Sequence, residues 1–222
     1  MNAAVALATA EAFYLPANPL IDALRKILAP PPGRTADFQN VLEAGCGTAK
    51  LSTVLALHHR NWNFTVFDLD AAALPVASRV AATVGALIGE RLNLSFGRLD
   101  VLNLAQLRNR EFDACFSEGM LNLFLPEVQA QAMKEMLRVA DVVAAVMPNG
   151  RVPPVAEKYL DPANKAVWGH SQDPEILLPA LREAVNNLQT SWEVVYPYTG
   201  DKDRDRQFIL VARWNTPREV VR

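Results

Sequence analysis

The residues best suited to binding a small ligand lie in one stretch, NVLEAGCGTAKLS (40–52). A short apolar run leads to an acid, Glu43, and to a turn of small residues around Gly45 and Gly47, after which apolar residues return at helical spacing. This pattern predicts a strand, a glycine turn and the start of a helix. Glycine lets the backbone adopt unusual angles and approach a ligand closely, and the free N–H groups at the start of the helix face whatever lies above the turn.

A dinucleotide is one candidate ligand for such a turn. The dinucleotide fingerprint, G-x-G-x-x-G/A, places a pyrophosphate on the helix N-terminus. Lys50 stands where the third small residue of that fingerprint belongs, and Glu43 would bring a carboxylate close to the phosphates. The stretch therefore argues against a dinucleotide, while a plain strand-to-helix turn in another α/β protein remains an alternative.

Three further predicted strands end in residues that could line the same site. Asp68 follows the second strand, where its carboxylate could accept hydrogen bonds from both hydroxyls of a ribose. Asp100 follows the third strand, and the fourth (112–117) leads into Glu118 and Gly119. Ligands of an open α/β sheet bind beyond the carboxyl ends of its strands, so we expect these residues to share one edge with the glycine turn. As alternatives, Asp68 caps the next helix and Asp100 is an ordinary loop acid.

The elements that must position these residues alternate between strands and helices. Alternation over about 150 residues predicts βαβ units and a parallel sheet, and the last two strands, with no helix between them, predict an antiparallel hairpin at one edge. Before the sheet, Asn18 and Pro19 begin an amphipathic helix that a proline-rich linker follows. We predict strands near 41–42, 63–67, 92–99, 112–117, 141–147, 192–196 and 207–214, helices at 19–28, 51–60, 71–89, 126–139 and 174–189, and a short helical segment at 102–108.

Composition excludes several classes of function. The chain has 222 residues with a net charge of −2, and no basic patch indicates a nucleic acid or an anionic membrane as partner. Its two cysteines, Cys46 and Cys115, predict reduced thiols in a cytoplasmic protein and are too few for a structural zinc site. We expect neither a secretory signal nor a membrane span. Alternating charges at 200–206 predict a solvated hairpin tip.

The form E-x-G-x-G-x-A, from Glu43 to Ala49, resembles motif I of the class I S-adenosylmethionine-dependent methyltransferases, in which the last small residue is usually glycine. This cofactor has no phosphate and carries an ammonium and a sulfonium group, which favour a nearby acid. The resemblance covers about residues 40–150 and rests on four strand ends in the right order. It implies an α/β three-layer sandwich with a mostly parallel seven-stranded sheet, a C-terminal antiparallel hairpin and helices on both faces. It divides the chain into an N-terminal helical arm or cap with its linker (1–39) and a methyltransferase domain (40–222).

The resemblance also implies roles for individual residues. Asp68, in VFDLDAAAL, takes the position of the acid that binds the ribose, and Asp70 would cap the next helix. Asp100, in GRLDVLNL, takes the position of the acid that accepts from the adenine amino group. The segment FDACFSEGMLNL (112–123) resembles the part that passes under the methyl donor, with core packing as the alternative for its apolar residues. The implied cofactor contacts are Glu43, Ala44, Gly45, Cys46, Gly47, Asp68, Leu69, Asp100, Val101, Ser117, Glu118 and Gly119; the expected acceptor contacts are Tyr14, Met120, Asn122 and Trp168.

The chemistry that follows is methyl transfer from S-adenosylmethionine to a small-molecule acceptor, with no metal. The cofactor supplies the reactivity in such a displacement, and the protein supplies orientation and a dry site, so a base is needed only if the acceptor must lose a proton. His170, in the long segment 148–173 that could fold over the pocket, is a hypothetical base, and an ordinary loop histidine is the alternative. The chain lacks the Asn/Asp-Pro-Pro-Tyr sequence of some enzymes that methylate amide or amine nitrogens. An NAD(P)-type oxidoreductase and a non-catalytic cofactor-binding protein remain alternatives, and the sequence does not indicate an oligomeric state.

Overall fold

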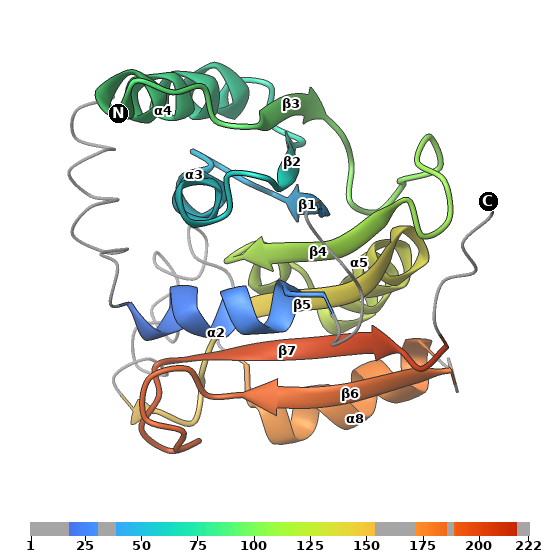
Figure 1. Cartoon of the computed structure of the whole chain (residues 1–222). Coiled ribbons are helices and arrows are strands. Elements are labelled where there is room, and N and C mark those ends of the chain that lie inside the picture. The colour runs from blue at the N-terminus through green and yellow to red at the C-terminus, as the bar shows by residue number, and fades with distance from the viewer. Residues whose placement is uncertain (1–17, 31–38, 154–171, 186–188, 217–222) are drawn as a thin grey trace.

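The centre of the molecule is a seven-stranded sheet with the order β3-β2-β1-β4-β5-β7-β6 (Figure 1). The computed structural model describes residues 18–30, 39–153, 172–185 and 189–216. Neighbouring strands are parallel except for β7, which pairs antiparallel with both β5 and β6, so the expected closing hairpin is confirmed. The strands are β1 (Asn40–Ala44), β2 (Asn63–Asp68), β3 (Leu94–Arg98), β4 (Phe112–Glu118), β5 (Ala140–Pro148), β6 (Thr190–Val195) and β7 (Gln207–Trp214).

Helices cover both faces of this sheet, which confirms the three-layer α/β sandwich (Figure 1). One face packs against α2 (Pro19–Leu28), α3 (Lys50–His58) and α4 (Ala73–Ile88). The other packs against α5 (Pro126–Val139), α8 (Pro174–Val185) and the 3₁₀ turn η1 (Leu121–Leu123). In the described part of the chain, no helix combines the length and apolarity needed to cross a bilayer.

Alternation along the strands sends neighbouring residues into different layers. In β1, Leu42 and Ala44 belong to the core under α5 and α8, whereas Val41 belongs to the core under α2, α3 and α4. Strand β5 is buried on both faces, which explains its almost unbroken apolar sequence, ADVVAAVMP. Because the side-chain period of a strand is two, Glu43 must lie on the same face as Val41.

Helix α2 forms as the sequence predicts. The side chain of Asn18 accepts a hydrogen bond from the amide of Leu20 at 2.9 Å, and Pro19 occupies the first turn. Its five large apolar residues are buried against β4, β5 and α3. Arg213 of β7 donates to the main-chain oxygen of Ile27 at 3.0 Å, which ties the end of the helix to the sheet. The division of the chain at residue 39 stays a prediction.

The short helix predicted at 102–108 is wrong, because the segment consists of turns. Four of its amides are bonded to side chains, and those of Asn103 and Leu107 are bonded to main-chain oxygens three residues back, so no helical ladder forms. The carboxylate of Asp100 accepts from the amide of Leu102 at 2.9 Å, and the side chain of Asn103 accepts from the amide of Ala105 at 3.3 Å. Asp and Asn side chains compete with helix formation in this way.

Candidate active site

The turn between β1 and α3 depends on two glycines. Gly45 (φ +67°) and Gly47 (φ +51°) both lie in the left-handed region that favours glycine. A Cβ on Gly45 would lie 2.5 Å from Cγ of Met120, whereas a Cβ on Gly47 would meet nothing within 4 Å. Gly45 therefore permits close packing against the segment after β4, and Gly47 leaves free space beside the turn.

Ala49 departs from motif I and adopts the conformation that a glycine would take most easily. Its φ is +52°, it is the N-cap residue of α3, and its methyl group is fully buried. A left-handed conformation costs an ordinary residue about 1–2 kcal/mol. Burial of the methyl group against the α2–α3–α4 core offsets part of that cost.

Asp68, the last residue of β2, reaches back to the glycine turn. Its Oδ2 accepts from the amide of Gly47 at 2.8 Å, and its Oδ1 accepts from the amide of Asp70 at 2.9 Å. Each carboxylate oxygen can accept more than one hydrogen bond, so both retain capacity for a ligand. Asp70 accepts from the amide of Ala72 at 2.8 Å, but Ala72 is the N-cap residue of α4, so the prediction that Asp70 caps this helix is wrong.

Glu43 is a buried acid under the N-terminal turn of α3. Its side chain accepts a hydrogen bond from the hydroxyl of Ser52, and the residue is 3% exposed. Burial raises the pKa of Glu43 to about 8; the bond from Ser52 opposes this shift, and Glu118 and Asp68 add to it. The carboxyl group is therefore largely protonated at neutral pH unless a cation lies nearby.

The strand ends enclose a cavity of about 680 Å³. Ten of the twelve implied cofactor contacts line it, as does the expected acceptor contact Met120: the ten are Glu43, Gly45, Cys46, Gly47, Asp68, Leu69, Asp100, Val101, Glu118 and Gly119. Ala44, Ser117 and Asn122 are buried and do not appear in the lining. Strand alternation explains the first two, because their side chains face the α5 layer while Glu43 and Glu118 face the α3 layer.

Several residues that line the cavity were not predicted from the sequence. Leu123 and Phe124 of the segment after β4 form an apolar wall, and Leu123 is half exposed. Asp70 and Lys50 add charges at the cavity. The signal for the apolar wall was the run of apolar residues after Gly119, for which core packing was the competing interpretation. The further unpredicted lining residues are Thr48, Leu51 and Phe67, and Leu99 lines the cavity as expected for an apolar neighbour of Asp100.

The charge of the lining is strongly acidic. Four acids of the lining, Asp68, Asp70, Asp100 and Glu118, outnumber its one lysine, Lys50, and the largely protonated Glu43 adds a fifth carboxyl group that a nearby cation would ionise. A cleft that is lined by charges of one sign and has low-dielectric walls raises the local concentration of ligands of the opposite charge. The cavity is therefore suited to a cationic ligand and unsuited to a pyrophosphate.

Three of the candidate residues lie outside the described part of the chain, and His59, which was not a candidate, lies away from the cavity. Tyr14, Trp168 and His170 belong to the parts of the chain that the structure does not describe. His59, at the end of α3, accepts a hydrogen bond from Nε of Arg25 at 3.2 Å and stacks on Trp62 at 3.8 Å. Burial and the adjacent Arg25 lower the pKa of His59 to about 4, in keeping with a structural position.

The two cysteines are free thiols, as the sequence predicts. Cys46 lies at the cavity, and Cys115 is fully buried in β4. Burial is the main cause that raises the pKa of both thiols, and the acid Glu43 raises both further. Both are therefore protonated and poorly nucleophilic.

Comparisons with known proteins agree with this geometry. Residues 41–141 match the family model described as a methyltransferase domain, and no curated protein matches the sequence. A S-adenosylmethionine-dependent methyltransferase from Methanosarcina mazei has a TM-score of 0.57 at 18% identity, over 82% of this chain and 94% of that one. Magnesium protoporphyrin IX methyltransferase from Synechocystis PCC 6803 with bound SAH has a TM-score of 0.61 at 17% identity, over 88% and 82%. A putative methyltransferase from Methanococcus maripaludis has a TM-score of 0.64 at 16% identity, over 99% and 94%. At these identities the likeness shows the fold.

Proposed function

We propose that the chain is a class I S-adenosylmethionine-dependent methyltransferase and that it transfers the methyl group of S-adenosylmethionine to a small-molecule acceptor. One observation carries the proposal: a single cavity joins the glycine turn, Asp68, Asp100 and the Glu118–Gly119 segment, all at the carboxyl ends of the strands. Solved relatives in this fold class include the Synechocystis enzyme with bound SAM and with bound SAH.

The residues present fit this cofactor in both charge and shape. S-adenosylmethionine supplies an electrophilic methyl group on a sulfonium, together with an ammonium group, and the acidic lining favours both charges. The free space beside Gly47 leaves room for a ligand to approach the main chain. Asp68 keeps unused acceptor capacity for the two ribose hydroxyls, and Asp100, between Leu99 and Val101, is placed to accept from the adenine amino group.

The acceptor would enter beside the segment after β4. Met120, Leu123 and Phe124 give that part of the lining an apolar surface, which excludes water and orients an apolar body. The cavity volume, shared with a cofactor, suits a small acceptor better than a macromolecular one. Orientation of the acceptor in line with the departing sulfur is then the main contribution of the protein.

Calorimetric titration with S-adenosylmethionine, S-adenosylhomocysteine and NADPH, followed by a methyl-transfer assay with methyl-labelled cofactor, tests the proposal. We expect both adenosyl ligands to bind and NADPH not to bind, and label to appear in at least one compound of a panel of amines, phenols, thiols and carboxylates. Binding of NADPH alone would support an oxidoreductase. Tight cofactor binding with no transfer to any class of acceptor would support a non-catalytic binding protein.

A further inference from the structure

Tyr198 lies at the same edge of the sheet as the cofactor cavity. It follows β6 in the loop that leads to β7, and β7 begins at Gln207, which pairs with Pro148, the last residue of β5. Two positions back along β5, Val146 pairs with Glu118 of β4 on one side and with Ile209 of β7 on the other. The hydroxyl of Tyr198 donates to Oε1 of Gln207 at 3.0 Å, so its polar end is fixed at the carboxyl edge.

Strand alternation places Glu118 and Gln207, the hydrogen-bond partner of Tyr198, on one face of the sheet. Ile209 of β7 and Phe116 of β4 belong to the core under α2, α3 and α4. Gln207 lies two positions from Ile209 and Glu118 two positions from Phe116, so both share that face. Tyr198, which is bonded to Gln207, therefore lies on the same side of the carboxyl edge as Glu118.

The loop that carries Tyr198 is rigidly held. The carboxylate of Asp205, 1% exposed, accepts from the amides of Tyr198 at 2.8 Å and Thr199 at 2.7 Å. Asn149, fully buried after β5, donates both amide hydrogens to main-chain oxygens of the same loop, those of Lys202 and Asp205, at 2.7 Å each. A partly exposed tyrosine on a fixed backbone presents a preorganised aromatic surface.

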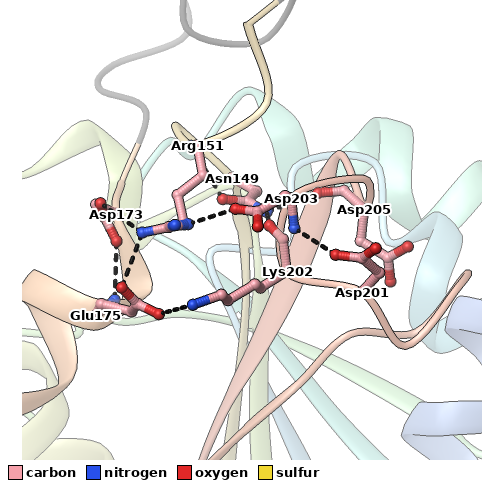
Figure 2. A network of polar contacts seen from close by, with 8 residues as sticks. All are labelled: Asn149, Arg151, Asp173, Glu175, Asp201, Lys202, Asp203 and Asp205. Carbon is pink, nitrogen blue, oxygen red and sulfur yellow. Dashed lines mark hydrogen bonds and ion pairs between the residues drawn. The ribbon is translucent and has the colours of Figure 1, made fainter.

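Around the buried side chains of Asn149 and Asp205, ion pairs neutralise two cations, Arg151 and Lys202 (Figure 2). Arg151 pairs with Asp173, Glu175 and Asp203, and Lys202 pairs with Glu175. The arginine is thereby surrounded by three carboxylates from two different segments. Neither cation is free to attract an anionic ligand toward Tyr198.

The electrostatic surroundings of the Tyr198 hydroxyl are acidic. Burial raises its pKa, and the carboxylates of Glu118 and Asp205 raise it further. The hydroxyl therefore stays protonated across the working pH range and donates hydrogen bonds. Glu118 links this tyrosine to the cofactor cavity, because its side chain is part of the lining.

We propose that Tyr198 and Glu118 form the acceptor-contacting wall of the site, and that this wall selects acceptors with a flat, apolar body that are neutral or bear an amine over acceptors that bear a carboxylate. The inference rests on the proposed function and names the class of its substrate. Tyr198, 43% exposed, supplies an aromatic face, and Met120, Leu123 and Phe124 supply apolar surface beyond Glu118. An anionic group beside Glu118 would be repelled, whereas an ammonium or a hydroxyl would be accepted.

Three matched probes test this wall in the protein saturated with S-adenosylhomocysteine. Benzylamine, benzyl alcohol and benzoate share one ring and differ in the charge of their substituent. Binding is measured by saturation-transfer NMR for the unmodified protein, Tyr198→Ala, Tyr198→Phe and Leu87→Ala, the last an exposed apolar residue of α4 that serves as control. Calorimetry with S-adenosylhomocysteine on every variant separates this test from the test of the cofactor site.

We expect benzylamine and benzyl alcohol to bind at least fivefold more tightly than benzoate. Tyr198→Ala should weaken both by fivefold or more, Tyr198→Phe should weaken them less, and Leu87→Ala should change nothing, with the affinity for S-adenosylhomocysteine within twofold throughout. Equal binding of benzoate, no binding of the first two probes at millimolar concentration, or an unchanged Tyr198→Ala variant would overturn the inference while leaving the cofactor site intact. Failure of S-adenosylhomocysteine to bind the unmodified protein would instead count against the proposed function.

Discussion

The carboxylate of Asp68 accepts a hydrogen bond from the main-chain amide of Gly47 across 2.8 Å, which joins the end of β2 to the glycine turn after β1. The same carboxylate is proposed to bind the cofactor ribose, so its removal has two effects. We expect Asp68→Ala to weaken S-adenosylmethionine binding by about 10–100-fold, since hydrogen bonds to a charged group contribute about 1.5–3 kcal/mol. Calorimetry measures the loss, and Asp22→Asn on α2, remote from the cavity, is the control. An Asp68→Ala variant that binds the cofactor as well as the unmodified protein would remove Asp68 from the site.

Replacing the two glycines of the turn by alanine should affect different properties, stability at Gly45 and cofactor affinity at Gly47. A Cβ on Gly45 would lie 2.5 Å from Met120, so Gly45→Ala should destabilise the fold by about 2 kcal/mol or more through overpacking and backbone strain. A Cβ on Gly47 would meet nothing within 4 Å, so Gly47→Ala should cost only about 1 kcal/mol of strain while obstructing the cofactor. Urea denaturation and calorimetry, run on both variants, separate stability from affinity. Equal stability losses, with affinity unchanged in Gly47→Ala, would contradict the geometry of the turn.

Glu43 should make stability depend on pH. Burial raises its pKa from the ordinary value of 4.5 to about 8 in the fold, so the folded state holds a proton that the unfolded state releases between these values. The unfolding free energy should therefore fall as pH rises from about 5 to 8, by at most about 1.4 kcal/mol per pH unit from this group. Glu43→Gln should flatten that slope, and Glu127→Gln, an exposed acid of α5, should leave it unchanged. Denaturant titrations at pH 5, 6, 7 and 8 measure the slope, and an identical pH profile in Glu43→Gln would exclude a buried, protonated Glu43.

The buried amide of Asn149 should contribute more to stability than the ion pairs of Arg151 around the β6–β7 loop. Asn149→Ala leaves the buried main-chain oxygen of Asp205 and the partly buried one of Lys202 without their donor, and the buried oxygen alone accounts for about 1–3 kcal/mol. Arg151→Ala removes ion pairs whose partner side chains are 31–57% exposed, and such pairs contribute about 0–1 kcal/mol. Urea denaturation at low and high salt should show a large, salt-independent loss for Asn149→Ala and a small, salt-sensitive one for Arg151→Ala. The reverse order would show that the ion pairs, and not the buried amide, hold the loop.

Much of the architecture follows from periodic patterns within single segments. Helix α5 and strand β7 begin and end where the sequence predicts, because apolar spacing and Pro126 mark their limits locally. The glycine turn, Asp68, Asp100 and Glu118 meet at one edge because parallel strands present their carboxyl ends together. These features depend only on local pattern and on the rules for parallel sheets.

What the sequence could not reveal depends on contacts between distant segments. The alternating charges at 200–206 predicted a solvated tip, yet Asp205 is 1% exposed because its partners include the loop amides and its backbone is held by Asn149. Ala44 and Ser117 neighbour lining residues along their strands but face the other layer, a distinction that requires the register of the sheet. Composition alone carries no information on either point.

The central claim is most directly tested by a crystal structure of the protein with S-adenosylhomocysteine. The account predicts the ribose hydroxyls within hydrogen-bond distance of Asp68, the adenine between Leu99 and Val101 with its amino group at Asp100, and the homocysteine part over the turn from Gly45 to Gly47. It also predicts the sulfur on the side of Glu118 and Tyr198, where an acceptor can reach it. Ligand density at any other place on the molecule, or none at a saturating concentration, would contradict it.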